Sequence, residues 1–167
     1  EIPLRLVGSE MCIRDSALSY LHTNGICHRD IKPENIVVMK DNTIKLIDFG
    51  LSINTRKERV ITNHVGTPGY IAPEIHSENS HHKSKLQDVW SFGILLYEFI
   101  SGQIPGNNKI EKPIYMSNNC FQFISACLTE NVFDRPSIDK LLMHPWIVMN
   151  KVKTVSYTHL TLPTIYS

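Results

Sequence analysis

The feature that most constrains this chain is a short hairpin signal with a polar, acid-bearing segment on each side. Two β-branched runs, residues 36–38 and 44–47, are separated by Lys40-Asp41-Asn42, a composition typical of a hairpin turn. The segment before the first run reads HRDIKPEN over residues 28–35, and the segment after the second reads DFG over residues 48–50. The two segments thus flank the hairpin, and each carries an acidic side chain.

Three polar side chains in these segments suit phosphoryl transfer. Asp30 and Asp48 supply carboxylates, and Asn35 supplies an amide oxygen. One carboxylate can accept the proton of an attacking hydroxyl group, while the other carboxylate and the amide oxygen hold Mg²⁺ against phosphates. The sequence therefore predicts a phosphoryl-transfer site at the mouth of the hairpin.

Outside the hairpin, the patterns are mostly helical. Four helices are expected, over residues 17–24, 87–100, 118–129 and 137–144. The second is apolar nearly all round, which predicts burial on most sides, and Gly102 closes it. The third is capped by Ser117 or Asn118 and the fourth by Ser137. Residues 50–73 read as a long polar loop, and a loop of this length is usually functional.

Composition excludes several classes of protein. Of the 167 residues, 42% are apolar and 20% are charged, as in an ordinary globular domain. The formal charge of +1 gives no support for a nucleic-acid or membrane partner. No apolar run approaches the roughly 18 residues of a membrane span, and the four cysteines form no CxxC pair. We expect a soluble, cytoplasmic protein with free thiols.

The two ends of the chain differ from its middle, because neither shows a helical or strand pattern. Codons for residues 11–16 can match the transposase end sequence of tagmentation libraries, and codons for residues 155–159 can match its reverse complement. We therefore expect residues 1–16 to be translated sequencing adapter. Residues 151–167 are expected to be a natural tail followed by adapter from about residue 155. The alternative is a genuine pair of irregular tails.

The ordered motifs resemble those of protein kinases. Residues 28–35 match the catalytic loop H-R-D-x-x-x-x-N, and D-F-G at 48–50 and A-P-E at 72–74 follow at the expected distances. A lone D-F-G would be weak, whereas the ordered set of three is specific. The resemblance implies an α+β, protein-kinase-like fold. Residues 17–150 would form a partial kinase domain, the mainly α-helical C-terminal lobe with a small β-hairpin, with the N-terminal lobe absent.

The resemblance also implies roles for the residues of these motifs. Asp30 would be the catalytic base, with Lys32 and Asn35 as further catalytic residues. The residues on the nucleotide side would be Lys32, Glu34, Asn35 and Asp48, and the metal ligands would be Asn35 and Asp48. ATP and Mg²⁺ are therefore the expected cofactors.

Residues near these motifs indicate which type of protein kinase the chain resembles. Lys32 together with GTPGY at residues 66–70 resembles serine/threonine rather than tyrosine kinases. By that resemblance, Thr67 would bridge Asp30 and Lys32. His-Pro-Trp at residues 144–146 resembles the closing motif of calcium/calmodulin-dependent-like kinases.

Substrate contacts are implied for Glu34, Thr67 and Glu98. Glu34 and Glu98 match positions that contact upstream arginines in kinases of basic peptides, and carboxylates attract such peptides by charge-assisted pairing. The expected partners are thus ATP and a protein substrate that is basic around the phosphosite. For Glu98, a salt bridge within its helix is an equal alternative.

Six further residues are implied to be structural: His28, Arg29, Phe49, Glu74, Asp88 and Arg135. For His28, the alternative is a general base, although Asp30 already fills that role. Arg29 resembles the arginine of kinases switched by loop phosphorylation. The usual acceptor position is Asn63 here, which leaves Thr62 as the phosphosite candidate, and a constitutively ordered loop is the alternative.

Some expected parts of a kinase are missing from the 167 residues. The sequence contains no glycine-rich phosphate loop and no strand lysine to pair with phosphates. The segment between Pro105 and Asn118 is also shorter than is usual in the family. We expect negligible kinase activity from the chain as given and activity from its full-length parent. A non-catalytic, pseudokinase-like scaffold is the alternative, and a small-molecule kinase fits poorly because residues 72–74 are present.

Overall fold

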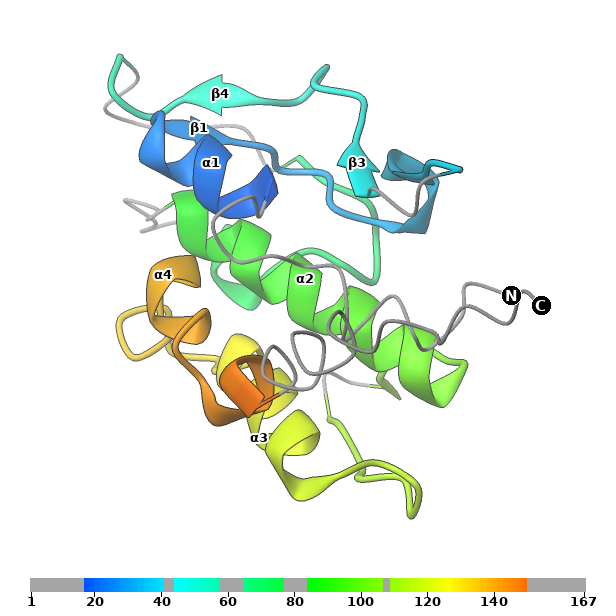
Figure 1. The fold of residues 1–167 in the computed structure, drawn as a ribbon. Coiled ribbons are helices and arrows are strands. Elements are labelled where there is room, and N and C mark those ends of the chain that lie inside the picture. Colours follow the sequence, from blue (N-terminus) through cyan, green and yellow to red (C-terminus); the bar gives the residue numbers. More distant parts are fainter. Residues whose placement is uncertain (1–16, 41–43, 58–64, 77–83, 107–108, 150–167) are drawn as a thin grey trace, which may run out of the picture.

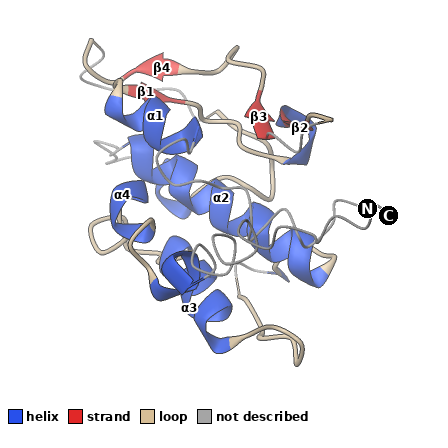
Figure 2. Cartoon of the chain, viewed as in Figure 1, coloured by secondary structure: helices blue, strands red, loops and turns tan. Residues whose placement is uncertain are grey.

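The computed structural model describes residues 17–40, 44–57, 65–76, 84–106 and 109–149. These residues form a mixed α and β fold in which helices predominate and two small strand pairs lie apart from each other (Figure 2). In Figure 1 the central helix, α2, has the strands and α1 on one side and α3 and α4 on the other. This arrangement agrees with the α+β class that the sequence predicts.

The expected hairpin is present. Strand β2 (Ile36–Val38) pairs antiparallel with β3 (Ile44–Leu46), with Ile36 opposite Leu46 and Val38 opposite Ile44. A single 3-10 turn, Pro33–Asn35, leads directly into β2. The second run predicts a strand to Ile47, but the strand ends at Leu46, and Ile47 instead donates its N–H to the carbonyl of Asn35 at 2.9 Å.

A second strand pair is not predicted by the sequence, and one of its strands lies in the segment predicted as loop. Strand β1 (Ile26–Cys27) pairs antiparallel with β4 (Ile53–Asn54). Each strand has two residues, too few to produce a visible alternation. Helix α1 (Ala17–Thr23) precedes β1, and Gly25, with φ of +78°, makes the turn between them, where glycine is favoured.

Helix α2 (Ser84–Ser101) forms the centre of the hydrophobic core. It is longer than expected at its start, and its buried residues include Val89, Trp90, Ile94 and Leu95. The prediction of a helix buried on most sides is confirmed. Gly102, with φ of +80°, follows its last residue, as the sequence predicts.

Helices α3 (Asn118–Cys127) and α4 (Ile138–Leu141) pack below α2 in Figure 1. Their N-caps are confirmed as Ser117 and Ser137, because the Ser117 side chain accepts from the N–H of Cys120 and that of Ser137 from the N–H of Lys140. A 3-10 turn, Pro73–His76, lies before α2.

The cysteines of the described ranges are buried thiols. Burial raises the pKa of Cys120 to about 11 and also raises the pKa of Cys127. Both thiols are therefore protonated at neutral pH and serve as core residues.

Several sequence expectations fall on residues outside the described ranges: the two ends (1–16 and 150–167), Thr62 and Asn63. In the part of the chain that the structure describes, no helix is both long and apolar enough to cross a membrane.

Candidate active site

Asp30, Lys32 and Thr67 form a closed triangle of polar contacts. The Lys32 ammonium lies 2.8 Å from Asp30 Oδ2 and donates to Thr67 Oγ1 at 2.8 Å. Thr67 Oγ1 donates in turn to Asp30 Oδ1 at 2.6 Å. Thr67 belongs to a segment 37 residues further along the chain, so the triangle joins two loops.

Asn35 also contacts Asp30, through two hydrogen bonds. Its amide nitrogen donates to the Asp30 backbone carbonyl at 2.8 Å and to Asp30 Oδ2 at 3.0 Å. Both contacts use the nitrogen, which leaves the amide oxygen of Asn35 as the atom that can ligate a cation. The Pro33–Asn35 turn places this side chain, because it brings Asn35 back toward Asp30 just before β2 begins.

The contacts around Asp30 change its acidity. Burial acts to raise the pKa of the Asp30 carboxyl group, but hydrogen bonds from Lys32, Thr67 and Asn35 and the positive charge of Lys32 together outweigh burial. The pKa of Asp30 is therefore lowered from 3.8, and the group is ionised at neutral pH. The pKa of Lys32 is raised, chiefly by its hydrogen bond to Asp30 and also by the charges of Glu34 and Asp48.

Asp48 lies at the exposed end of the hairpin. Its backbone has φ of +60°, and its Oδ1 accepts from the N–H of Gly50 at 3.1 Å. The bond from Ile47 to the carbonyl of Asn35 ties the residue before Asp48 to the other proposed metal ligand. The charge of Asp48 also acts on Lys32, so the structure brings Asp48 near the contacts around Asp30.

Oxygen ligands from Asn35 and Asp48 suit Mg²⁺, which keeps several waters and binds through one or two carboxylates plus phosphates. Among the described residues, no group of three or more His, Cys, Asp or Glu side chains could hold a metal ion by itself.

Asp88, on α2, supports the loop that carries Asp30. Its two oxygens accept from consecutive backbone N–H groups, those of His28 and Arg29, each at 2.8 Å. Arg29 has φ of +68°, an unfavourable region for a residue with a Cβ. The buried carboxylate therefore stabilises a strained turn immediately before Asp30.

The His28 ring is fully buried, and both of its nitrogens contact the main chain. Nε2 donates to the Ile47 carbonyl at 3.1 Å, and Nδ1 accepts from the N–H of Asp30 at 3.3 Å. Phe49 packs edge-on against the ring, with 5.0 Å between centroids. Because the backbone occupies both nitrogens, these contacts favour packing over a general-base role.

Glu74 and Arg135 form a buried ion pair with two hydrogen bonds, of 2.7 and 2.9 Å. Arg29 Nε donates to the Leu51 carbonyl at 2.5 Å, so its guanidinium lies beside the segment after β3. The structural residues implied by the resemblance therefore all make contacts between segments.

The three expected substrate residues lie in different surroundings. Thr67 belongs to the triangle around Asp30, and Glu34 is exposed on the Pro33–Asn35 turn. Glu98, on α2, accepts a hydrogen bond from the hydroxyl group of Tyr70. Burial and the contact with Glu98 raise the pKa of Tyr70, so it remains a donor. The alternative expectation for Glu98, a salt bridge within its helix, is not what the structure shows for this carboxylate.

Sequence reasoning missed two contributors. The His22 ring reaches Asp88, 66 residues away, at 2.9 Å, and a single histidine at a helix end gives no signal of this contact. The sequence does not indicate Tyr70 as the partner of Glu98, because only the folded chain brings the two residues together.

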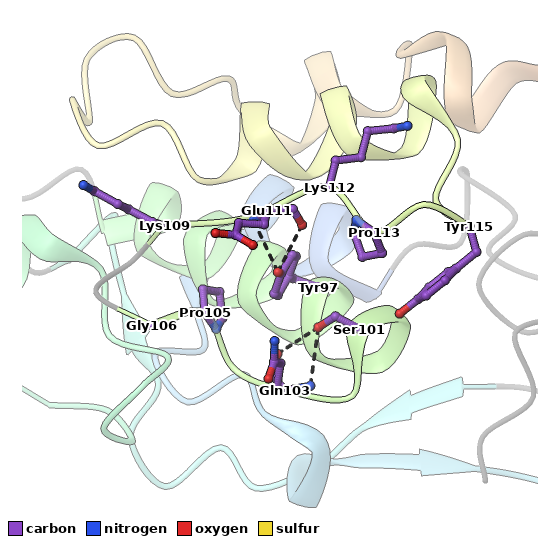
Figure 3. A pocket seen from close by; sticks show the side chains of 10 residues that line it. All are labelled: Tyr97, Ser101, Gln103, Pro105, Gly106, Lys109, Glu111, Lys112, Pro113 and Tyr115. Atoms are coloured by element: carbon purple, nitrogen blue, oxygen red, sulfur yellow. Dashed lines mark hydrogen bonds between the residues drawn. The ribbon is translucent and has the colours of Figure 1, made fainter.

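A separate depression of about 600 Å³ lies at the C-terminal end of α2 (Figure 3). It surrounds Tyr97, whose hydroxyl group donates to the backbone carbonyl of Glu111 at 3.1 Å. Figure 3 shows the side chains of Lys109 and Lys112 extending away from the Tyr97 ring. No residue of the triangle around Asp30 lines this depression, so we assign it no part in the chemistry.

Comparison with known proteins identifies the family. A family model described as "Protein kinase domain" matches residues 14–147. Protein kinase kin1 of Schizosaccharomyces pombe is 36% identical over 148 residues, covering 81% of this chain and 16% of kin1. Serine/threonine-protein kinase kin-29 of Caenorhabditis briggsae is 38% identical over 152 residues, covering 83% and 19% respectively. Serine/threonine-protein kinase pim-2 of Danio rerio is 40% identical over 144 residues, covering 81% and 46%.

This chain thus spans from 16% to 46% of the length of these three relatives. The family match covers all of the residues assembled around Asp30, Asp48 and Asp88. The chain therefore belongs to the protein kinase family, and within it to the eukaryotic serine/threonine kinases.

Proposed function

We propose that this chain carries the phosphoryl-transfer site of a protein serine/threonine kinase, which transfers the γ-phosphoryl group of ATP to a hydroxyl group of a protein substrate. The observation that carries the proposal is the triangle of Asp30, Lys32 and Thr67, because it joins a carboxylate base, a cation and a second loop within 2.6 to 2.8 Å.

Asp30 is the base in this proposal. Its carboxylate is ionised at neutral pH, so it can accept the proton of a substrate hydroxyl group as the new O–P bond forms. The bond between the γ-phosphorus and the oxygen that bridges it to the β-phosphate breaks, and its electrons stay with ADP. Lys32 places a positive charge beside Asp30, where it can neutralise charge on the transferred group.

Asn35 and Asp48 would hold Mg²⁺ through their side-chain oxygens. When bound, the ion supplies neutralisation of phosphate charge, for which these oxygen ligands are suited. Asn35 has a second task, since its amide nitrogen fixes the orientation of the Asp30 carboxylate. Glu34 lies next to Asn35 on the Pro33–Asn35 turn, and we propose that it also faces the nucleotide.

For the substrate, we propose a peptide that is basic around the phosphorylated residue. Glu34 is an exposed carboxylate close enough to Tyr70 for its charge to help raise the pKa of that residue. Tyr70 in turn contacts Glu98. Two carboxylates thus lie around one tyrosine, an arrangement that favours a cationic side chain.

The proposal also concerns the extent of the active unit. Residues 17–150 are proposed to be the C-terminal lobe of the kinase domain, with residues 1–16 and the chain from about residue 155 contributing nothing to it. The 167 residues hold no glycine-rich phosphate loop, so their activity on their own should be negligible. Sequencing the gene across the codon for Ala17 checks whether residues 1–16 are encoded there.

The test uses the whole protein that contains this sequence. Transfer of radioactive phosphate from γ-labelled ATP to an arginine-rich peptide is measured for the wild type, for Asp30→Asn and for the control Asp139→Asn. Asp139 is an exposed carboxylate on α4 that contacts Ser19 rather than the site. We expect Asp30→Asn to lose nearly all activity and Asp139→Asn to retain it. An inactive wild-type protein that still folds would instead support the scaffold alternative.

A further inference from the structure

We propose that Arg56 is a positioning residue that anchors the chain after Asp48 to the C-terminal end of α1, and that Gly25 makes room for its side chain. Arg56 lies just beyond β4, and Gly25 lies between α1 and β1. The consequence for a bound magnesium ion rests on the function proposed above, whereas the anchoring contact does not.

The guanidinium group of Arg56 binds the last residue of α1. Its Nη2 donates to the backbone carbonyl of Thr23 at 2.7 Å, across 33 positions of the sequence. The final carbonyls of a helix have no partner within the helix and carry partial negative charge, so a cation is stabilising there. Arg56 therefore joins the chain that follows β4 to the end of the helix that precedes β1.

The side chain of Arg56 crosses directly over Gly25. A Cβ atom at Gly25 would lie 2.7 Å from Arg56 Cγ and 2.9 Å from its Nε, closer than real contacts allow. Gly25 is buried although Arg56 is exposed, so the glycine lies beneath the stem of the arginine. The φ of +78° at Gly25 is one that asparagine can also adopt, but any side chain there would displace Arg56.

Two residues next to Arg56 hold its backbone in place. The N–H and the hydroxyl group of Thr55 both donate to the Gly25 carbonyl, at 2.7 and 3.0 Å. The side-chain oxygen of Asn54 accepts from the N–H of Arg56 at 3.0 Å. The turn after β4 thus contacts the residues before β1 through both main chain and side chains, and it presents Arg56 to the end of α1.

This anchor matters because the β1–β4 pair is very short. Each strand has two residues, fewer than the roughly three to ten that are usual for a strand, so the pair depends on contacts beyond its ends. Between Asp48 and β4 the chain makes a tight turn, in which the Ser52 N–H donates to the Phe49 carbonyl at 3.0 Å. Movement of β4 therefore reaches Asp48 over a short, hydrogen-bonded link.

Asp48 is sensitive to such movement. Its φ of +60° is uncommon for a residue with a Cβ, and such a conformation persists only where the surrounding structure holds it. When β4 separates from β1, Asp48 can relax toward ordinary backbone angles, which would turn its carboxylate away from the proposed metal position. We therefore expect a higher Mg²⁺ concentration for half-maximal activity, with little change in the KM for a peptide substrate.

The experiment compares Arg56→Met, Gly25→Ala and the double variant in the whole protein. Lys57→Met is the matched control, because Lys57 is the next exposed cation and contacts Asn54 through its backbone N–H, which methionine retains. Amide hydrogen exchange of peptides that cover residues 51–57 is the first readout, and it needs no activity. The dependence of kcat on Mg²⁺ concentration and the KM for an arginine-rich peptide are the second.

We expect Arg56→Met to speed exchange in residues 51–57 by roughly three- to tenfold, the effect of one lost hydrogen bond, and to raise the Mg²⁺ requirement. Lys57→Met should change neither. Gly25→Ala should speed exchange at least as much as Arg56→Met, because it displaces Arg56 and adds backbone strain. The double variant should exchange no faster than Gly25→Ala, since the contact can be lost only once.

Unchanged exchange in Arg56→Met, or a double variant whose effect is the product of the two single effects, would overturn the proposal. Faster exchange with an unchanged Mg²⁺ requirement would overturn the positioning role. If Gly25→Ala does not fold, Arg56→Lys replaces it and should keep most of the protection, because lysine retains a donor for the Thr23 carbonyl; a loss equal to that of Arg56→Met would contradict the anchor. An inactive wild type would count against the proposed function, while the exchange data would still decide whether Arg56 anchors the chain.

Discussion

Arg135 and Glu74, 61 residues apart, form an ion pair through two parallel hydrogen bonds. The Arg135 guanidinium is also 2.9 Å from the carbonyls of Thr129 and Leu86 and lies over the Trp90 ring at 4.9 Å. One side chain thus joins the A-P-E segment, the start of α2 and the loop after α3. Planar, two-point pairing of this kind is specific to arginine.

Replacing Arg135 with methionine should destabilise the protein strongly. The Arg135 side chain is 0% exposed and that of Glu74 is 11% exposed, so the remaining carboxylate would be buried without its partner. We expect the free energy of unfolding to fall by about 3–5 kcal/mol, measured by urea denaturation.

The double variant Arg135→Met/Glu74→Leu is the matched control. Removing both charges also removes the carboxylate that has lost Arg135, so part of the lost stability should return. Recovery should be incomplete, because the carbonyls of Thr129 and Leu86 still lose the hydrogen bonds that Arg135 donates to them. A double variant no more stable than Arg135→Met alone would contradict this account.

Gly93, inside α2, should not tolerate alanine. A Cβ atom at this position would lie 2.6 Å from Cys127 Cβ and 2.9 Å from Leu128 Cδ2, closer than real contacts allow. Alanine usually stabilises a helix interior by up to about 1 kcal/mol relative to glycine, but overpacking of about 1–3 kcal/mol should dominate here. Thermal unfolding of Gly93→Ala tests this, with Gly106→Ala as the control, since nothing lies within 4 Å of its added Cβ. A Gly93→Ala protein as stable as the wild type would show that α2 and α3 can move apart.

The longer elements of the fold could be predicted from the sequence. Helices α2 and α3 carry enough apolar residues to show a pattern, and serine caps mark where α3 and α4 begin. Strands β1 and β4 could not be predicted, because two residues show no alternation and their pairing depends on contacts between distant segments.

The candidate site shows the same difference between local motifs and contacts of distant residues. Asp30, Asn35 and Asp48 belong to contiguous motifs beside a hairpin, so the sequence alone indicates that they meet. His22 and Tyr70 act through partners 66 and 28 residues away, Asp88 and Glu98, and no local pattern encodes such a distance. Long-range side-chain contacts are the part that only the fold reveals.

Acid should remove part of the stability that Asp30 contributes. Its pKa is lowered from 3.8 in the folded protein, so folding favours the ionised form. This contribution is fully present above the unfolded pKa of about 3.9 and is lost as the pH falls through the folded pKa. The difference in unfolding free energy between the wild type and Asp30→Asn should therefore be constant from pH 7 to about pH 5. Below about pH 4, the wild type should lose stability relative to Asp30→Asn. Urea titrations at each pH measure it, and a difference that stays constant down to pH 3 would contradict the lowered pKa.

The Thr67 hydroxyl group should matter for catalysis more than for folding. It donates to Asp30 Oδ1 and accepts from the Lys32 ammonium, so one oxygen sets the spacing between the proposed base and its cation. Thr67→Val keeps the shape of the side chain but removes this oxygen, and we expect kcat of the whole protein to fall roughly tenfold.

Thr67→Ser retains the hydroxyl group and should keep most of the activity. Thr129→Val is the matched control, because it also removes a threonine hydroxyl that donates a hydrogen bond, at 3.0 Å to the carbonyl of Ala126, away from the site. Steady-state measurement of kcat with an arginine-rich peptide compares Thr67→Val, Thr67→Ser and Thr129→Val with the wild type. Equal activity in Thr67→Val and wild type would mean that Lys32 and Asp30 hold their geometry without the bridge, through the direct 2.8 Å contact between them. Loss in Thr67→Ser as large as in Thr67→Val would contradict the expectation that the hydroxyl group alone is sufficient, and it would mean that the methyl group is needed as well.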